Sequence, residues 1–256
     1  MSLIPNQMYR AYDAINASLL KSVLSHSYWK AKIPLKPSAA MQLGTHIHCA
    51  VLEPEVFANT YTRLSDDINL RTNAGKAEKA EAEKNGGVAL RGDEYDMIVG
   101  IAEQMQTYPE IRQYFNEDTI YEVSMTFEMD EYPGLEFKSQ IDLYDPRSGV
   151  LLDLKTTADI TRAERQFFDL HYALQLRFYQ RALRANGYNA DTVKVLFVEA
   201  NPPHQPAIFH LTDSLLDVGE SEICQAMAKL LDERQLDKPR LIERTLDAPT
   251  WIKERK

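Results

Sequence analysis

Residues 149–155 (GVLLDLK) place an aspartate and a lysine inside a strongly apolar run of strand length. Such a run is typical of a strand buried in a sheet, where a charge is costly unless a cation or an opposite charge compensates it. Side chains alternate along a strand, so Asp153 and Lys155 share one face while Leu152 and Leu154 occupy the other. The chain must therefore build a sheet that carries charge inside the protein.

Two further segments, 120–129 and 135–144, also alternate or run apolar over strand length, and the turn-like sequences DEYPG and DPRSG separate the three segments. Together they predict a three-stranded antiparallel meander. Alternation predicts that Tyr121 and Val123 share an apolar face, as do Ile141 and Leu143. The opposite side of the sheet then presents four charged residues: Glu122, Asp142, Asp153 and Lys155.

The remaining periodicity is mostly helical and predicts an α/β fold with a central mixed sheet flanked by helices. Helices are expected over residues 15–29, with Asn16 or Ser18 as cap, and over 38–52, 92–107, 161–186 and 214–235; strands are expected over 192–199 and 207–211. The polar segment 66–87 reads as a solvated insertion or an exposed helix. We expect a single domain over 1–256, with a helical part to about residue 115 and a sheet-bearing core at about 116–236.

The composition bears on location and partners. The net charge of −9 argues mildly against general nucleic-acid binding, although clustered acids that hold metal would contribute to it. No stretch approaches the roughly 20 apolar residues of a membrane span, and the first residues lack a signal-peptide layout, so a cytoplasmic location without membrane contact is expected. Cys49 and Cys224 lie in apolar helical patterns and are expected to be buried free thiols.

The pattern [DE]-x-K occurs at 136–138, 153–155 and 254–256. A chain of this length contains D-x-K about once by chance, so the surroundings must decide. Residues 136–138 follow a Pro-Gly turn and are expected to form a solvated strand end, and 254–256 are expected to be a frayed terminus. Asp153 and Lys155 lie in a buried strand and call for a function, although an ion pair without catalysis is the alternative.

Phosphodiester hydrolysis fits such a pair. The reaction needs an activated water and stabilised oxygens, and divalent metals held by carboxylates provide both. A lysine two residues beyond the metal-binding aspartate lies on the same face about 7 Å along the strand. Lys155 could therefore orient the attacking water or help to deprotonate it.

Two helical spacings place further candidates on single helix faces. Gly44 and His48 form G-x-x-x-H, which permits a close backbone approach and an imidazole ligand, unless His48 is an ordinary buried histidine; His46 points elsewhere. Gln175 and Tyr179 form Q-x-x-x-Y. The helix around them carries several arginines that line a DNA path or form a solvated face: Arg162, Arg165, Arg177, Arg181 and Arg184.

Taken in order, these motifs resemble the RecB-like branch of the PD-(D/E)xK nucleases. The phrases LGTHIHCAVLEPE, QIDLYD, LLDLKTT and YALQLRFYQRAL are most similar to the exonuclease VIII (RecE-type) catalytic domain of phages and prophages, over residues 15–210. The resemblance implies a restriction-endonuclease-like core and a Mg²⁺-dependent exonuclease, with Mn²⁺ able to substitute. Such an enzyme digests the 5′-ended strand of linear duplex DNA from its ends and leaves a 3′ tail. It implies a ring-shaped homo-oligomer that works beside a RecT-type single-strand annealing protein.

The resemblance also implies roles for individual residues. His48, Asp142, Asp153 and the Leu154 carbonyl would bind metal, and Glu122 would join a second metal shell or a water relay. Lys155 would position or activate the water. Gln175 and Tyr179 would brace the site or contact a phosphate, and Arg177 is a further candidate for DNA contact.

The sequence departs from the branch in two ways. Ser139 stands where the branch often has glycine. Two cysteines cannot hold the iron–sulfur cluster of some relatives, so no cluster is expected. The alternatives are an endonuclease or helicase-associated nuclease of the same fold, and a non-catalytic DNA-end-binding module.

Overall fold

The computed structural model describes residues 6–243, 245 and 247. Its centre is a five-stranded sheet in the order β3-β4-β5-β6-β7. The strands are β3 Ile120–Phe127, β4 Phe137–Asp145, β5 Val150–Thr157, β6 Thr192–Glu199 and β7 Pro206–His210. Strands β3, β4 and β5 form an antiparallel meander, β6 lies parallel to β5, and β7 lies antiparallel to β6. The predicted meander and mixed sheet are thus confirmed.

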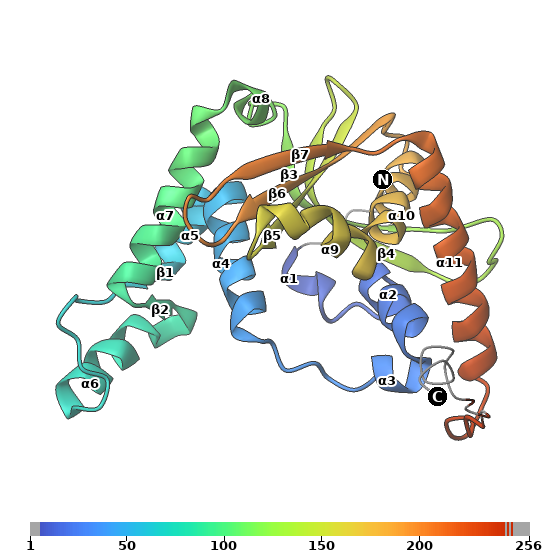
Figure 1. Cartoon of the computed structure of the whole chain (residues 1–256), viewed down its shortest axis with the longest axis horizontal. Coiled ribbons are helices and arrows are strands. Elements are labelled where there is room, and N and C mark those ends of the chain that lie inside the picture. Colours follow the sequence, from blue (N-terminus) through green and yellow to red (C-terminus); the bar gives the residue numbers. More distant parts are fainter. Residues whose placement is uncertain (1–5, 244, 246, 248–256) are drawn as a thin grey trace, which may run out of the picture.

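Helices cover both faces of this sheet (Figure 1). The first half of the chain contains α1 Asn6–Tyr9, α2 Ala17–Ser25, α3 Tyr28–Ala31, α4 Ala39–Leu52, α5 Pro54–Thr60, α6 Asn73–Ala82, η1 Lys84–Gly86, α7 Gly92–Thr107 and α8 Pro109–Arg112. Within it, β1 Tyr61–Arg63 pairs in parallel with β2 Val88–Leu90. The second half contributes η2 Ile160–Arg162, α9 Ala163–Asp169, α10 Tyr172–Ala185 and α11 Asp213–Glu233.

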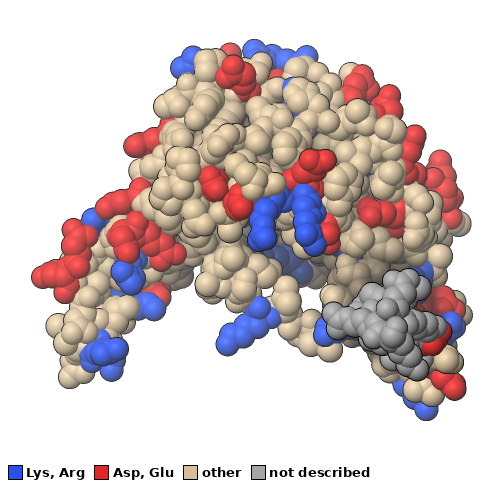
Figure 2. All heavy atoms as spheres, viewed as in Figure 1, with Lys and Arg blue, Asp and Glu red and all other residues tan. Residues whose placement is uncertain are grey.

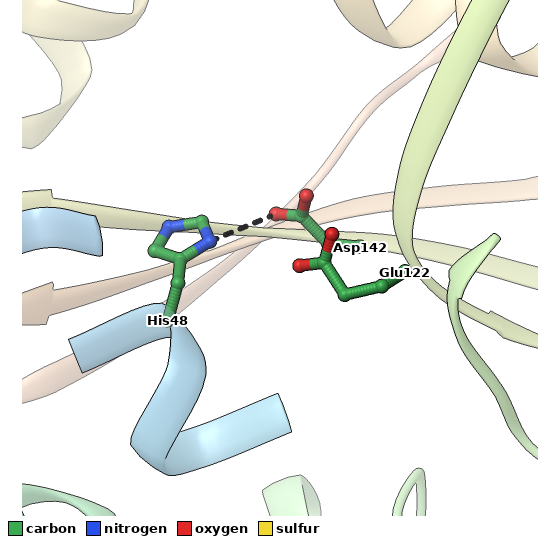
Figure 3. A group of neighbouring side chains, drawn as sticks. All are labelled: His48, Glu122 and Asp142. Carbon is green, nitrogen blue, oxygen red and sulfur yellow. Dashed lines mark ion pairs between the residues drawn. The ribbon is translucent and has the colours of Figure 1, made fainter. Parts of the chain in front are cut away.

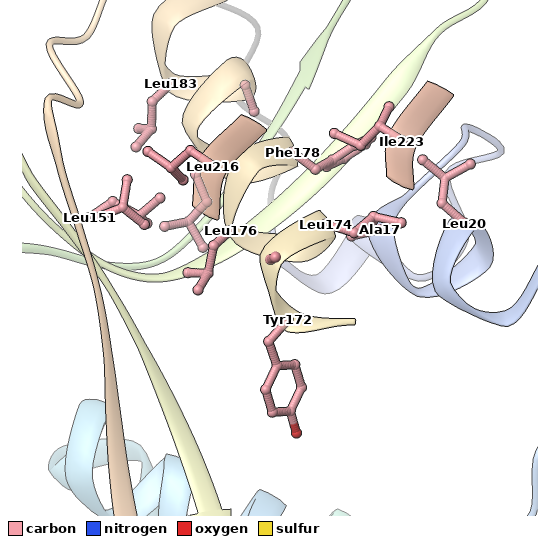
Figure 4. Packing of buried hydrophobic residues seen from close by; sticks show 14 of the residues in the cluster. Ala17, Leu20, Leu151, Tyr172, Leu174, Leu176, Phe178, Leu183, Leu216 and Ile223 are labelled. Carbon is pink, nitrogen blue, oxygen red and sulfur yellow. The ribbon is translucent and has the colours of Figure 1, made fainter. Parts of the chain in front are cut away.

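Two hydrophobic cores hold these layers together. Helices α2, α10 and α11 pack on one face of the sheet, where Leu20, Leu174 and Phe178 are fully buried (Figure 4). Helices α4, α5, α7 and α8 pack on the other face around Ile47 and Ile98. Each large apolar side chain that is fully buried contributes about 1.5–3 kcal/mol, so the two cores fix the helices that flank the sheet.

Most of the predicted helices are present, and capping residues mark where several of them begin. Asn16 accepts a hydrogen bond from the Leu19 amide (2.8 Å), and Ser38 caps α4 in the same way. The segment 66–87 contains the exposed helix α6. The strands β1 and β2 were not predicted, because three residues are too few to show a period.

The helix predicted over 161–186 is wrong in one respect, because the chain forms η2, α9 and α10 instead. His171 separates α9 from α10 with a left-handed backbone (φ 51°), which no α-helix can contain. The Glu222 Oε1 of α11 lies 2.6 Å from His171 Nδ1 and holds the break in place.

The predicted faces of β3 and β4 are also partly wrong. Tyr121 joins the core beneath α4 and α7, whereas Val123 joins the core beneath α10, because Glu122 between them has a left-handed backbone (φ 47°). Strand β4 changes face at the same level, since Ile141 and Leu143 also belong to different cores. The two strands therefore switch faces together at Glu122 and Asp142.

Three smaller expectations have different outcomes. Cys49 is half-buried, but Cys224 is exposed on α11, which corrects the prediction of a buried thiol. Lys138 is buried, so residues 136–138 are not a solvated strand end; the segment 254–256 lies outside the described residues. None of the described helices is long and apolar enough to cross a membrane.

Candidate active site

A cleft of about 1130 Å³ opens where β4 and β5 meet the helices of both layers. Residues from α4, from the sheet and from α10 line it together, among them Gly44, His48, Glu122, Asp142, Lys155, Tyr172 and Tyr179. The structure thus brings residues from five separate segments of the sequence to one place.

The cleft exists because β4 and β5 separate. They pair only between residues 143–145 and 150–152, and beyond this point Ile15 takes the place of β5 beside the start of β4. The Leu154 amide, released from the ladder, donates to Asp142 Oδ2 (2.8 Å) instead. The carboxylate of Asp142 is therefore held between the two strands by a backbone donor.

His48, Glu122 and Asp142 converge in this gap (Figure 3). Their ligand atoms all lie within 4.8 Å of one another, and His48 Nδ1 is 3.7 Å from Asp142 Oδ2. One imidazole and two carboxylates from α4, β3 and β4 are a donor set that divalent metals use. These three residues fit the metal site that the sequence predicts.

Burial and neighbouring charges shift the pKa values of all three groups. Burial, followed by the charges of Asp142, Glu53 and Asp153, raises the pKa of Glu122 to about 8. Burial also raises the pKa of Asp142. Burial and the charge of Lys155 lower the pKa of His48 to about 4, which leaves the imidazole neutral at neutral pH. A bound cation would favour the ionised acids and the neutral histidine, which are the forms that bind metal.

Asp153 and Lys155 lie directly behind this group. Asp153 is fully buried, and its Oδ2 is 2.5 Å from Lys155 Nζ. This close contact pairs the carboxylate directly with the ammonium. The predicted shared face of Asp153 and Lys155 is confirmed.

The charges of this pair depend on each other. Burial raises the pKa of Asp153 to about 6, and the charge of Lys155 offsets part of this rise. Burial opposes the charge of Lys155, but Asp153 and Asp142 more than offset it and raise the pKa of the ammonium. Lys155 Nζ also donates to the Leu154 carbonyl (3.2 Å). Lys155 is therefore a protonated donor at neutral pH.

Gln175 and Tyr179 reach the site from α10, as their spacing predicts. Gln175 Nε2 donates to Asp153 Oδ1 (3.2 Å) and to the Tyr179 hydroxyl (3.1 Å). Sequence reasoning missed two neighbours: Lys21 of α2, which donates to Gln175 Oε1, and Tyr172, whose ring lies under both Lys21 and Lys155. A single lysine inside the apolar run LLKSVL was the available signal for the first.

Gly44 allows helix α4 to lie close to β5, because a Cβ at this position would lie only 3.0 Å from Thr156 Oγ1. His46 Nδ1 lies 3.1 Å from the Tyr61 hydroxyl and not among the predicted metal ligands. Arg177 is not brought to the site: its Nε donates to Glu220 Oε2 (2.7 Å), and it lines a second cleft of about 620 Å³.

Comparisons with known proteins agree with this geometry. A family model described as a PDDEXK-like domain of unknown function (DUF3799) matches residues 13–240. The chain belongs to this PDDEXK-like family. A search of curated proteins gave no match. The PD-(D/E)xK core implied by the sequence motifs is thus confirmed at the level of the family.

Solved structures extend the likeness over the whole PDDEXK-like chain. A putative exonuclease from Eubacterium rectale is similar with a TM-score of 0.66 and 18% identity, over 99% of this chain and 98% of that chain. A phage related exonuclease from Haemophilus somnus 129PT matches with a TM-score of 0.38 and 12% identity, over 90% of this chain and 100% of that chain. The first likeness shows that the two proteins share a fold.

Proposed function

We propose that this chain is a Mg²⁺-dependent exodeoxyribonuclease that hydrolyses phosphodiester bonds of linear double-stranded DNA. The observation that carries this proposal is the convergence of His48, Glu122 and Asp142 beside the Asp153–Lys155 ion pair in one open cleft. The family and the exonuclease name of the structurally similar protein from Eubacterium rectale support it.

The first group of site residues is proposed to bind the cation. His48, Glu122, Asp142 and Asp153 hold the cation, together with the Leu154 carbonyl. When bound, Mg²⁺ or Mn²⁺ supplies Lewis acidity toward a phosphoryl oxygen and toward the attacking water. Acids that are costly to bury together would become favourable ligands when a cation is bound.

Lys155 acts on the water and the phosphate as a charged donor. Because Asp153 and Asp142 raise its pKa, its ammonium stays protonated and can orient a water through a hydrogen bond. The same charge stabilises the negative charge that develops on the phosphoryl oxygens. Gln175 donates to Asp153 and to the Tyr179 hydroxyl, and it thereby helps to fix the carboxylate that pairs with the lysine.

The charge distribution offers DNA a path despite the net charge of −9. On the face shown in Figure 2 the outline is hollowed between the α6 end and the α3–α11 end, and lysine and arginine side chains project into the hollow. Acidic side chains lie along both sides of this face, and a few also lie in its centre beside the basic ones. A local basic hollow in an acidic protein favours a duplex that enters at one place.

The direction and setting of the reaction follow the exonuclease VIII-like motifs. In this proposal the enzyme digests the 5′-ended strand, leaves 3′ tails for recombination, forms a ring of identical subunits and works with a RecT-type annealing protein. Light scattering tests the ring, and duplexes labelled at either the 5′ or the 3′ end test the direction.

The deciding experiment incubates blunt linear, nicked and covalently closed circular duplex DNA with the protein and Mg²⁺, with EDTA as control. Degradation of linear DNA alone is expected. Cutting of closed circles would identify an endonuclease, and retention of linear DNA without cleavage would identify an end-binding module; either result contradicts the proposal. A requirement for an added helicase and ATP would identify a helicase-associated nuclease.

A further inference from the structure

Lys21 lies close to the active-site residues although no predicted motif contains it. It follows Leu20, which is fully buried between α2, α10 and α11, so the backbone of α2 is fixed against α10 at this point (Figure 4). Its Nζ lies 4.9 Å from the centre of the Tyr172 ring. The same ring lies under Lys155 Nζ at 5.1 Å, so one tyrosine supports both lysines.

The contact that matters is the one with Gln175. Lys21 Nζ donates to Gln175 Oε1, while Gln175 Nε2 donates to Asp153 Oδ1 (3.2 Å) and to the Tyr179 hydroxyl (3.1 Å). A continuous chain of polar contacts therefore runs from Lys21 through one amide to the buried carboxylate. Lys21 makes no direct ion pair with that carboxylate in the described structure, which separates its position from that of Lys155.

Lysine has only donors, so the amide atom that faces Lys21 must be the oxygen. The NH₂ group is then directed toward Asp153 and Tyr179. A charged donor on the oxygen also polarises the amide and strengthens donation from its nitrogen. Without Lys21, Gln175 Oε1 would lose its donor and the amide would be free to rotate toward water.

We propose that Lys21 is a positioning residue of the metal site, which acts through the Gln175 amide to hold the Asp153 carboxylate in its ligand orientation. This inference rests on the proposed function for the identity of the bound cation. It assigns to α2, far from the motifs in the sequence, a part in building the site.

Mn²⁺ binding to the DNA-free protein tests the inference by calorimetry, independently of cleavage. Lys21→Met and Gln175→Ala are each expected to raise the dissociation constant for Mn²⁺ about tenfold, as for other residues that orient metal ligands. Because both substitutions act through the same amide, the double variant is expected to bind Mn²⁺ no more weakly than the single variant with the lower affinity. Equal binding by Lys21→Met and wild type, or effects that multiply in the double variant, would overturn the proposal.

Lys194→Met is the matched control. Lys194 is also a buried lysine that contacts a tyrosine, with its Nζ donating to the Tyr114 hydroxyl and lying 4.8 Å from the ring centre, but it lies on β6 outside the metal site. Its Mn²⁺ affinity is expected to stay within about twofold of wild type. A tenfold loss in this variant as well would show a general effect of removing a buried lysine and would contradict the inference.

Two further variants decide the matter if Lys21→Met does not fold. Lys21→Arg keeps a pure donor and is expected to bind Mn²⁺ nearly as wild type, whereas Lys21→Gln can also accept a hydrogen bond, tolerates a reversed Gln175 amide and is expected to bind more weakly. Equal affinity of the two variants would overturn the proposal. Absence of DNA cleavage by the wild type would refute the proposed function but leave this comparison of affinities valid.

Discussion

The start of β4 and the middle of β5 carry the same three-residue pattern, with Glu136 and Lys138 in one and Asp153 and Lys155 in the other. Both lysines are largely removed from solvent, Lys138 with 5% exposure and Lys155 with 13% of its side chain exposed. Lys138 donates to the main-chain carbonyls of Tyr9 and Tyr12, whereas Lys155 contacts a carboxylate.

The acids differ more than the lysines. Glu136 is exposed and accepts a hydrogen bond from the Tyr12 hydroxyl (2.6 Å), but Asp153 is fully buried. Burial lowers the pKa of Lys138, whereas the carboxylates around Lys155 raise its pKa. The first pair fastens the N-terminal segment to the sheet, and the second concentrates charge in the cleft. Only the second pair fits the proposed chemistry, because its acid is buried and further carboxylates lie around its lysine.

Removal of each lysine gives the largest contrast. Lys155→Ala is expected to reduce the rate of cleavage of linear duplex at least about 1000-fold, because it removes a donor used in the transition state. Mn²⁺ and DNA binding should largely survive. Single-turnover cleavage and calorimetry measure the two properties. A near-wild-type rate in this variant would show that the active site has been assigned wrongly.

Neutralising the two acids is the next test. Asp153→Asn keeps an oxygen for the Gln175 amide but loses a charge, and it is expected to raise the Mg²⁺ concentration needed for half-maximal cleavage by at least roughly tenfold. Glu136→Gln, the equivalent change in the other segment, should leave this concentration unchanged. The same Mg²⁺ requirement in both variants would remove the distinction between the segments.

Lys138→Met is expected to affect folding and not the chemical step. It leaves the Tyr9 and Tyr12 carbonyls without their donor, which should lower the free energy of unfolding by about 1–3 kcal/mol. The kcat of the folded protein should stay within about twofold of wild type. Urea denaturation and cleavage at low temperature measure the two effects, and a large loss of kcat without a loss of stability would contradict this interpretation.

The acids around Lys155 also predict a pH-dependent cost of folding, carried most by Glu122. Folding raises the pKa of Glu122 from 4.5 to about 8. The free-energy cost of burying its charge is therefore absent below pH 4.5, grows as the pH rises, and is complete above about pH 8. In EDTA, Glu122→Gln should therefore melt above wild type by about 2–4 °C at pH 8.5, with little difference at pH 5. A gap that does not change with pH, or the same gap for Glu136→Gln, would contradict this assignment.

The elements with long, regular periods were predictable. The strands and the helices at α4, α7 and α11 follow directly from alternation, helical spacing and capping residues such as Ser38. The meander also predicted that Asp153 and Lys155 would share a face. These predictions hold because the apolar face of a long element leaves few ways to pack it.

The local departures from regular geometry were not predictable. The left-handed residues Glu122 and His171 interrupt a strand and a helix whose sequences read as continuous. The separation of β4 from β5 depends on Ile15, which is more than 100 residues away in sequence, and Lys21 meets Gln175 only after α2 packs on α10. These contacts are determined by tertiary packing and cannot be predicted from the local sequence pattern.

The left-handed backbone at Glu122 means that selection for stability and selection for activity favour different residues at this position. A non-glycine residue in this conformation costs about 1–3 kcal/mol, and its carboxylate adds repulsion to that cost. A library selected only for thermal tolerance would therefore be enriched in glycine and asparagine at position 122, which relieve the backbone and discard the charge. A library selected for turnover would retain glutamate there. Engineering for stability should therefore avoid position 122, because the substitutions that relieve its backbone would also remove a proposed metal ligand.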